Sequence, residues 1–405
     1  MANECGIVIG GVDTHRDIHV AAIVDAQGRI LETGEFATTA AGCRQLLDWM
    51  RSFGTVERVG VEGTGAYGAG LSRHLRDEGI AVVEVNRPNR QVRRRRGKSD
   101  VVDAEAAARA ALNGEAAVTP KTKDNLVESI RVLRVAFTSA RNSRTRVANQ
   151  VRDLIITAPD QLRGTLDPLT TAERVERCGK FRPGDPADPT EATRLALRTL
   201  SRRYLALTEE MGELTTTLDK LTARANPALR AARGVGVDVA GILLVTAGDN
   251  PERLTGEAAF AALCGVSPIQ ASSGRTHRHR LNRSGNRQAN HALWRIAMVR
   301  LTCDPRTKAY IERRTAEGKS RREIMRCLKR YIAREIFALL TDPKVVPNGQ
   351  DLRAERTRRA LSLRTVAEAL STSISSVSRL ELGRTHDVEF AVRYGNWLES
   401  VASAA

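Results

Sequence analysis

The sequence predicts an α/β N-terminal domain followed by long α-helices, a mainly α domain and a C-terminal all-α module. Three observations carry this prediction. Short apolar runs alternate with turn residues and helical spacing up to residue 85. Two long segments rich in Arg, Leu and Ala follow, and residues 351–401 read as a compact set of short helices. The order of strands and helices at the start suits a mixed sheet with helices packed on it.

The first part of the chain contains the predicted strands. Three apolar runs at the start, separated by turn residues such as Asp25 and Gly28, predict an antiparallel meander. Two further strands follow predicted helices. The predicted strands are 6–12, 18–24, 30–36, 56–61 and 81–85, and the predicted helices are 40–53, 68–78 and 100–112.

Long helices are predicted for residues 124–155 and 190–225. Residues 158–189 between them are rich in Pro and Gly and cannot be helical throughout. This pattern indicates an antiparallel helical hairpin or an oligomerisation arm. The apolar spacing is not regular enough to indicate a coiled coil.

The charge balance points to a polyanionic partner. The 405 residues include 64 Lys and Arg against 47 Asp and Glu, a formal net charge of +17, and the sequence pI is about 10.3. Nucleic acid is the natural partner for such a chain. Aromatic residues make up only 4%, which argues against a base-stacking platform and favours contacts to backbone phosphate.

Cysteine usage and hydropathy bear on location. The cysteines are scattered without metal-site spacing, which is typical of reduced thiols and gives no support for zinc. The N-terminus shows no charged-then-apolar leader, and no apolar stretch is long enough to cross a bilayer. We expect a cytoplasmic, nucleoid-associated protein without a membrane partner.

Four acidic residues form the first candidate site. Asp13 ends the first predicted strand, and Glu62 ends the strand 56–61. Asp100 and Asp103 start a predicted helix, and their spacing places both on one helical face. Such a group suits Mg²⁺ or Mn²⁺, and two such ions can activate and stabilise the oxygens of a phosphodiester. From the residues alone two alternatives stay open: Asp100 as a helix cap, and Glu62 as a solvated strand end.

Basic residues lie beside both candidate sites. Residues 86–98 contain no acid and include the candidate DNA-binding residues Arg93, Arg94, Arg95 and Arg96. A second basic stretch follows Ser273-Gly274 and includes Arg275, Arg278 and Arg280. A serine hydroxyl beside such cations can meet a phosphate, but it needs activation to act as a nucleophile. On the residues alone, a turn in a surface loop is the better interpretation of this serine.

Two smaller patterns also concern DNA. Gly234-Val-Gly236 resembles the turn of a helix-hairpin-helix element, and an ordinary helix-to-helix turn explains it equally well. Residues 351–384 resemble the repressor-type helix-turn-helix of phage Cro, with helices at 363–370 and 374–382. Ser375, Ser376 and Arg379 then face the groove. The alternative is a helical bundle used for dimerisation.

Three phrases in order resemble the N-terminal domain of the DEDD insertion-sequence transposases, the IS110 family. They are GVDTHRDIHVAAIVDAQGRIL, VGVEGTGAYGAGL and GKSDVVDAEAAARAA. The resemblance implies a RuvC-like domain with the ribonuclease H fold, and it places the four acids of the family on Asp13, Glu62, Asp100 and Asp103.

The second half resembles the C-terminal domain of the same family. Gly265, Pro268, Ser273-Gly274 and Gly285 match its pattern, which implies that Ser273, or Ser272 beside it, is a nucleophile. One departure is Ala289-Asn290, where the family has Leu-Arg, and it weakens any assignment of DNA contacts there.

The resemblance covers residues 5–340 and implies a transposase that cuts and rejoins DNA with a serine nucleophile and a Mg²⁺-binding acidic tetrad. Because recombination requires coordinated cuts in two duplexes, we expect a homodimer or tetramer. The resemblance also implies that a structured guide RNA encoded by the element can set the site. The alternatives are a metal-only, resolvase-like nuclease, or a DNA-binding regulator with a decayed site. The expected domains are 5–120 (RuvC-like), 121–226 (helical arm), 227–342 (serine-containing) and 350–402 (helix-turn-helix, added to the family plan).

Overall fold

The computed structural model describes residues 6–85, 99–116, 118–272, 274, 279–342, 347–385 and 387–402. The chain forms two compact units. The first consists of Met1–Asn125 with Ala247–Leu254, and the second of Leu126–Thr246 with Thr255–Ala405. Each unit is described by itself.

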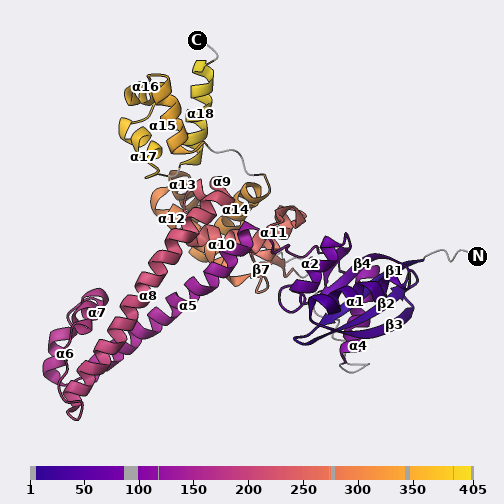
Figure 1. Cartoon of the computed structure of the whole chain (residues 1–405). Coiled ribbons are helices and arrows are strands. Elements are labelled where there is room, and N and C mark those ends of the chain that lie inside the picture. The colour runs from indigo at the N-terminus through magenta and orange to yellow at the C-terminus, as the bar shows by residue number, and fades with distance from the viewer. Residues whose placement is uncertain are drawn as a thin grey trace, which may run out of the picture. The chain divides into compact units, whose positions relative to one another are not determined.

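A five-stranded mixed sheet forms the centre of the first unit (Figure 1). Its strand order is β3-β2-β1-β4-β5, in which β1, β2 and β3 are antiparallel and β1, β4 and β5 are parallel. This confirms the predicted meander and the mixed sheet. The strands are β1 (Ile7–Thr14), β2 (Ile18–Asp25), β3 (Ile30–Ala37), β4 (Thr55–Glu62) and β5 (Ala81–Val85).

Helices cover both faces of this sheet. On one face, α1 (Ala40–Arg51) and α2 (Ala69–Asp77) bury Leu46 and Leu71 against the strands. On the other face, α4 (Asp100–Leu112) packs its small alanine side chains against β1 and β2. Since alanine adds little bulk, α4 can lie close to the sheet, and the start of this helix comes to the edge where β1 ends.

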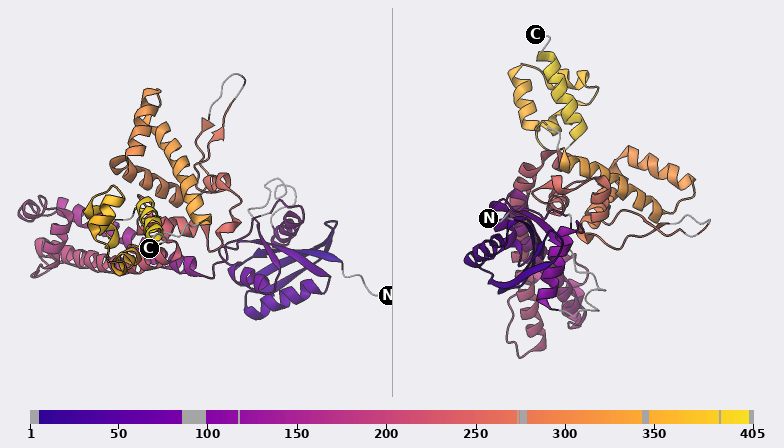
Figure 2. Two further views of the ribbon diagram at one scale, coloured as in Figure 1. Left: turned by 90° about the horizontal axis from the view of Figure 1, so that it is seen from above. Right: turned by 90° about the vertical axis from the view of Figure 1, so that its right-hand side faces the viewer.

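A long helical hairpin belongs to the second unit. The helices α5 (Leu126–Ile156) and α8 (Pro189–Ala225) lie side by side in all views (Figures 1 and 2). Val147, Val151 and Ile155 near the end of α5 share a buried cluster with Leu197 near the start of α8, so the two helices are antiparallel. This confirms the predicted pairing. Two short helices, α6 (Asp160–Leu166) and α7 (Thr171–Gly179), occupy the Pro/Gly-rich connection.

The next part of the second unit is mainly helical. Its helices are α9 (Pro227–Ala231), α10 (Val237–Ala247), α11 (Glu257–Leu263), α12 (Arg287–Cys303), α13 (Pro305–Ala316) and α14 (Arg321–Thr341), with the 3₁₀ turn η1 (Pro251–Arg253) belonging to the first unit. A small antiparallel ribbon pairs β6 (Ile269–Gln270) with β7 (His279–Arg280).

An ion-pair cluster joins the base of the hairpin to these helices. Asp238 on α10 bonds to Arg134 of α5 at 2.5 Å and to Arg295 of α12. Burial alone would raise the pKa of Asp238, but the bonds to Arg134 and Arg295 outweigh burial and hold the pKa below its usual value. The cluster therefore stabilises the fold while Asp238 is ionised.

Four short helices form the C-terminal module: α15 (Gly349–Arg358), α16 (Leu363–Ala369), α17 (Ile374–Glu381) and α18 (Val388–Ala402). The helices α16 and α17 agree with the two predicted at 363–370 and 374–382. Their apolar side chains surround Tyr394, whose hydroxyl donates to buried Glu381 at 2.9 Å. Arg356 also donates to Glu381, so this buried carboxylate is satisfied from two sides. Among the described helices, none has both the length and the apolar character needed to span a membrane.

Candidate active site

Two of the predicted acids come to one edge of the sheet. The adjacent strands β1 and β4 are parallel, and Val12 pairs with Val61, so Asp13 and Glu62 follow at the same level. Val12 and Val61 are buried toward α1 and α2. Because side chains alternate along a strand, Asp13 and Glu62 lie on the opposite face, the one that α4 covers.

Two glycines allow α4 to approach this face closely. A Cβ atom on Gly11 would lie 2.1 Å from the amide nitrogen of Ala108, and a Cβ on Gly60 would lie 2.5 Å from the carbonyl oxygen of Ala107. Real Cβ atoms do not approach backbone atoms this closely, so both positions need glycine. Each glycine precedes an acid by two residues on its strand, and the close approach brings the start of α4 to Asp13 and Glu62.

The start of α4 supplies the other two acids. Ser99 is the N-cap, because its hydroxyl accepts from the amide of Val102 at 3.3 Å. Asp100 is the first residue of the helix, so the alternative that Asp100 is the helix cap is wrong. Asp103, one turn later, is only 2% exposed, whereas Asp100 is exposed. A buried carboxylate in the first turn is favoured by the helix dipole.

A histidine that the sequence analysis did not single out joins this group. Nε2 of His15 lies 3.2 Å from Oδ2 of Asp13 and 3.4 Å from Oδ1 of Asp100. Single ligand atoms of Asp13, His15 and Asp100 all lie within 4.8 Å of one another. His15 stands in the turn between β1 and β2, two residues after Asp13, and this spacing was the signal that could have identified it.

The electrostatics of Asp13 reflect the crowding of these groups. Burial raises the pKa of Asp13 above its usual value, and the carboxylates of Asp103 and Asp100 raise it further, while His15 acts in the opposite direction. Asp103 is thus electrostatically coupled to Asp13, although the close trio is Asp13, His15 and Asp100. Glu62 is half-buried, and the pairing register of β1 with β4 places it at the same level as Asp13.

These residues fit a divalent cation. A cation would offset the mutual repulsion of Asp13, Asp100 and Asp103 and favour ionised Asp13, so the cost of gathering these carboxylates is recovered on binding. Oxygen donors suit Mg²⁺ and Mn²⁺, and an imidazole nitrogen is the softer ligand. The sheet edge therefore has the donor set of a metal site.

The serine region lies in the second unit. The ribbon of β6 and β7 flanks it, and Ser272 and Arg280 are exposed. The predicted nucleophile Ser273 and the basic residues Arg275, Arg278 and Arg93, Arg94, Arg95 and Arg96 lie outside the described residues. Gly274 has a positive φ of 55°, the backbone geometry of a tight turn.

The departure at Ala289-Asn290 has a structural explanation. Ala289 is fully buried in α12. The side-chain amide of Asn290 donates to the carbonyl oxygens of Cys264 at 2.9 Å and Gly265 at 3.1 Å, and its oxygen accepts from Lys329. Asn290 thus fastens the end of α11, where the serine region begins, to α12 and α14.

Of the predicted groove residues of the C-terminal module, Ser375 and Arg379 are exposed and Ser376 is half-buried. Ser373 caps α17 by accepting from the amide of Ser376, and its hydroxyl lies 2.9 Å from those of Ser375 and Ser376. The guanidinium of Arg379 donates to the Ser375 carbonyl. Gly234 has a φ of 85° in the connection between α9 and α10, as a tight turn requires.

Comparison with known proteins finds similarity to one family over two segments. Residues 10–157 match a family model described as a transposase of the DEDD IS110 type, and residues 226–312 match a model described as the transposase IS116/IS110/IS902 family. The chain is 36% identical over 118 residues to the insertion element IS110 uncharacterized 43.6 kDa protein of Streptomyces coelicolor. The aligned segment spans 29% of this chain and 29% of that relative. The acids fall in the first matched segment and the serine region in the second.

Proposed function

Because the chain belongs to the IS110 family of insertion-sequence transposases, we propose that it cuts and rejoins DNA. The observation that carries this proposal is the convergence of Asp13, His15 and Asp100 inside the first matched segment, on an edge shared with Glu62. A net charge of +17 suits a protein that must hold several DNA strands against their own repulsion.

The acids supply the metal-binding half of this function. Asp13, Glu62, Asp100 and Asp103 hold Mg²⁺ or Mn²⁺, with His15 as an added ligand or as a donor that orients Asp13. A divalent cation held by these residues would supply Lewis-acid polarisation of the phosphate and offset the charge of the displaced oxygen. Burial of Asp13 and Asp103 keeps these carboxylates in one place, so the site is organised before DNA arrives.

Ser273 supplies the nucleophile, and Ser272 is the neighbouring alternative. Its hydroxyl oxygen attacks a DNA phosphorus, so a serine–phosphate ester forms and the bond to the leaving strand oxygen breaks. The proton lost by the serine balances the proton gained by the leaving hydroxyl. Attack by another DNA hydroxyl on the ester reverses these bond changes, frees the serine and joins the new strands.

The remaining assignments concern partners. The substrate is DNA at the element ends and the target, with Arg93, Arg94, Arg95, Arg96, Arg275, Arg278 and Arg280 on phosphates. A homodimer or tetramer coordinates cuts in two duplexes, and a structured RNA encoded by the element guides the choice of site. The C-terminal module, with Ser375 and Arg379 exposed and Ser376 half-buried, binds DNA as a helix-turn-helix.

A strand-transfer assay tests this function. Labelled element-end DNA and target DNA are incubated with Mg²⁺ and the RNA of the element, with wild type, Asp13→Asn and an Asp17→Asn control at an exposed acid two residues from His15. We expect joined product with wild type and with the control, and none with Asp13→Asn. Cleavage that needs Asp13 but never gives joined product would instead support the second candidate, a metal-only nuclease. DNA binding without cleavage, whichever divalent metal ion is added, would support the third candidate, a DNA-binding regulator.

A further inference from the structure

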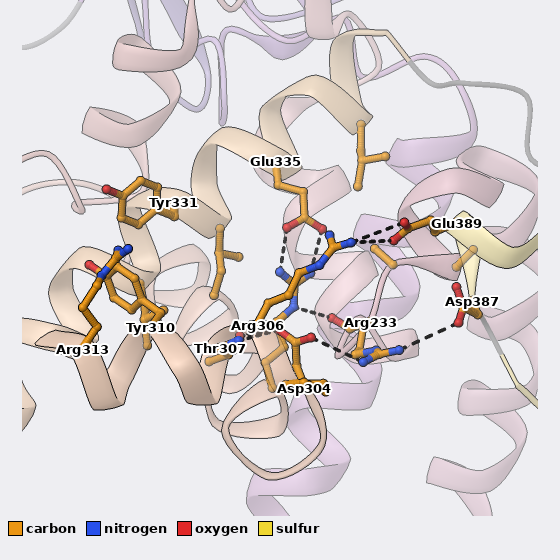
Figure 3. A pocket seen from close by; sticks show the side chains of 17 residues that line it. Arg233, Asp304, Arg306, Thr307, Tyr310, Arg313, Tyr331, Glu335, Asp387 and Glu389 are labelled. Atoms are coloured by element: carbon orange, nitrogen blue, oxygen red, sulfur yellow. Dashed lines mark hydrogen bonds and ion pairs between the residues drawn. The ribbon is translucent and has the colours of Figure 1, made fainter. Parts of the chain in front are cut away.

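A large pocket of the second unit lies outside the sites described so far. Its volume is about 810 Å³, which is within the range of small-molecule sites. Its walls come from the α9–α10 connection, α13, α14 and the start of α18 (Figure 3). The polar and aromatic residues that matter are Arg233, Arg306, Arg313, Tyr310, Tyr331 and, from the C-terminal module, Asp387 and Glu389.

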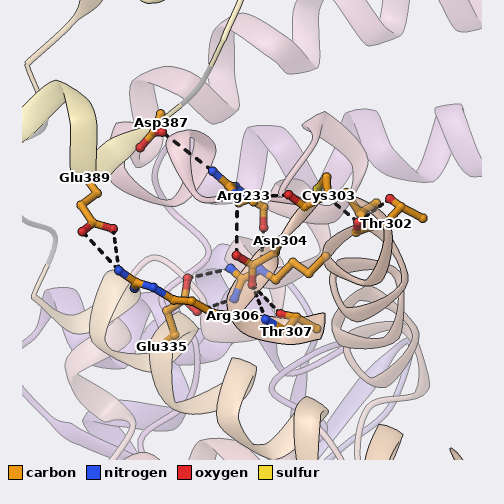
Figure 4. A network of polar contacts seen from close by, with 11 residues as sticks. Arg233, Thr302, Cys303, Asp304, Arg306, Thr307, Glu335, Asp387 and Glu389 are labelled. Carbon is orange, nitrogen blue, oxygen red and sulfur yellow. Dashed lines mark hydrogen bonds and ion pairs between the residues drawn. The ribbon is translucent and has the colours of Figure 1, made fainter. Parts of the chain in front are cut away.

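Two carboxylates of the C-terminal module meet arginines of this pocket (Figure 4). Glu389 lies 3.3 and 3.4 Å from the guanidinium of Arg306, and Asp387 lies 3.8 Å from that of Arg233. Arg306 and Glu389 are highly exposed, with 83% and 77% of their side chains accessible. Exposed ion pairs of this kind contribute little to stability, so another anion can displace the carboxylates.

The wall that these carboxylates face is cationic. Arg300 is already held by Glu335 through two bonds of 2.6 and 2.7 Å. The guanidinium of Arg233 forms an ion pair with the carboxylate of Asp304 at 3.4 Å. Arg306 and Arg313 project from α13, and most of each side chain is exposed. Asp387 and Glu389 therefore occupy positions where anionic oxygens are attracted.

Aromatic rings adjoin the arginines in the same pocket. Tyr331 is 56% exposed and meets Tyr310 edge to face, with the ring centroids 5.7 Å apart. The guanidinium of Arg313 lies over Tyr310 at 5.5 Å. An exposed ring beside guanidinium groups is the arrangement that stacks an unpaired base while its phosphates are paired. The low aromatic content of the whole chain argued against such a platform, but composition does not reveal a local pair.

We propose that this pocket binds a single-stranded nucleic-acid segment, with a base stacked on Tyr331 and its phosphates on Arg306 and Arg233. This inference rests on the proposed transposase function, in which strands are exposed during cutting and exchange. Asp387 and Glu389 occupy the phosphate positions until the strand displaces them. An unpaired strand is favoured over a duplex because only an unpaired base offers its ring face to a tyrosine.

Binding without cleavage tests the pocket. Fluorescence anisotropy is measured with the full chain and short labelled oligothymidylate, oligouridylate and duplex DNA at one fixed salt concentration. We expect Tyr331→Ala and Arg306→Gln each to weaken single-strand binding about tenfold, with a smaller effect on duplex binding. Tyr331→Phe keeps the ring and should bind as wild type does. The double variant Asp387→Asn, Glu389→Gln should bind about threefold more tightly, since it removes the competing carboxylates.

An arginine elsewhere provides the matched control. Arg29 is 78% exposed and paired with Asp25, so Arg29→Gln removes a comparable charge without touching the pocket. Single-strand affinity unchanged by both Tyr331→Ala and Arg306→Gln would overturn the proposal. Anisotropy measures binding and needs no catalysis. If the pocket variants bind single strands as wild type does and wild type still carries out strand transfer, the pocket proposal fails and the proposed function stands. If Asp13→Asn binds single strands normally while Tyr331→Ala and Arg306→Gln bind them more weakly, the pocket is supported independently of cleavage. Relative affinities of the two oligonucleotides distinguish DNA from RNA as the source of the strand.

Discussion

Nε2 of His15 lies 3.2 Å from the carboxylate of Asp13, and the same nitrogen reaches toward Asp100 at 3.4 Å. This single ring connects the end of β1 with the start of α4, two elements that are distant in the sequence. An imidazole between two carboxylates occupies the place that a cation would take or share. The relationship makes the acidic edge testable by metal binding, separately from DNA chemistry.

Replacing Asp13 by Asn should stabilise the metal-free protein and abolish its response to metal. The pKa of Asp13 is raised in the folded state, so its ionised form is penalised there, and this penalty is present as the pH rises above the ordinary value of 3.8. Removing the charge at neutral pH should raise Tm by about 2 °C in EDTA. Saturating Mn²⁺ should raise the Tm of wild type but not of Asp13→Asn. Two results would contradict this prediction: a lower Tm of Asp13→Asn than of wild type in EDTA, or an increase in Tm with Mn²⁺ that is the same in Asp13→Asn as in wild type.

As the pH is lowered, the affinity for Mn²⁺ should begin to fall at a pH above the usual pKa range of an aspartate. Protons compete with the metal for Asp13, and its raised pKa extends that competition to a higher pH than 3.8. Calorimetric titration at a series of pH values measures the midpoint. A midpoint below 3.8 would show that Asp13 is not the titrating ligand.

His15→Ala should weaken Mn²⁺ binding by about tenfold, which is the scale at which ligands and their hydrogen-bonding partners affect metal affinity. The loss should be larger for Mn²⁺ than for Mg²⁺ if the imidazole is a ligand, since nitrogen suits the softer ion. Competition with a metal-sensitive dye measures both affinities. His291→Ala, at an exposed histidine of α12, is the control and should change neither.

Gly11→Ala should damage the acidic edge through packing alone. The new methyl group would meet the backbone of Ala108 at 2.1 Å and of Ala104 at 2.3 Å, so α4 must move away from β1. We expect a loss of about 3 kcal/mol in the free energy of unfolding, together with weaker Mn²⁺ binding. Gly70→Ala in α2 is matched, because nothing lies within 4 Å of the added atom. That control should be neutral or slightly stabilising, and equal losses for both variants would refute the packing argument.

Asp238→Asn should destabilise the second unit by about 3 kcal/mol, because it leaves Arg134 and Arg295 without their shared carboxylate. The folded pKa of Asp238 lies below 3.8, so the ion pairs stabilise the fold above that pH and are lost as the pH falls through the folded pKa. The difference between wild type and variant should therefore shrink below pH 3.8. Denaturant unfolding measures it, with Asp153→Asn at an exposed pair as the control. A loss that persists unchanged at low pH would contradict an ionic origin.

The sequence predicted the sheet, the long helices and the placement of the four acids near one edge, because alternation and helical spacing are local signals. The positions of Gly11 and Gly60 could not be interpreted as close-approach sites, since that requires knowing where α4 packs. His15 was missed because a histidine in a short turn has no periodic pattern of its own. Asn290 looked like a lost DNA contact, and its hydrogen bonds to Cys264 and Gly265 depend on long-range packing.

Trapping a covalent adduct tests the central proposal, that cutting and rejoining DNA requires both the acids and the serine. Labelled element-end DNA is incubated with Mg²⁺ and the RNA of the element, and wild type, Ser273→Ala, Ser272→Ala and Asp13→Asn are resolved on a denaturing gel. We predict a protein–DNA adduct with wild type and Ser272→Ala that is absent with Ser273→Ala and with Asp13→Asn. Cleavage without any adduct, unaffected by either serine substitution, would contradict the serine mechanism and leave the acidic site acting alone.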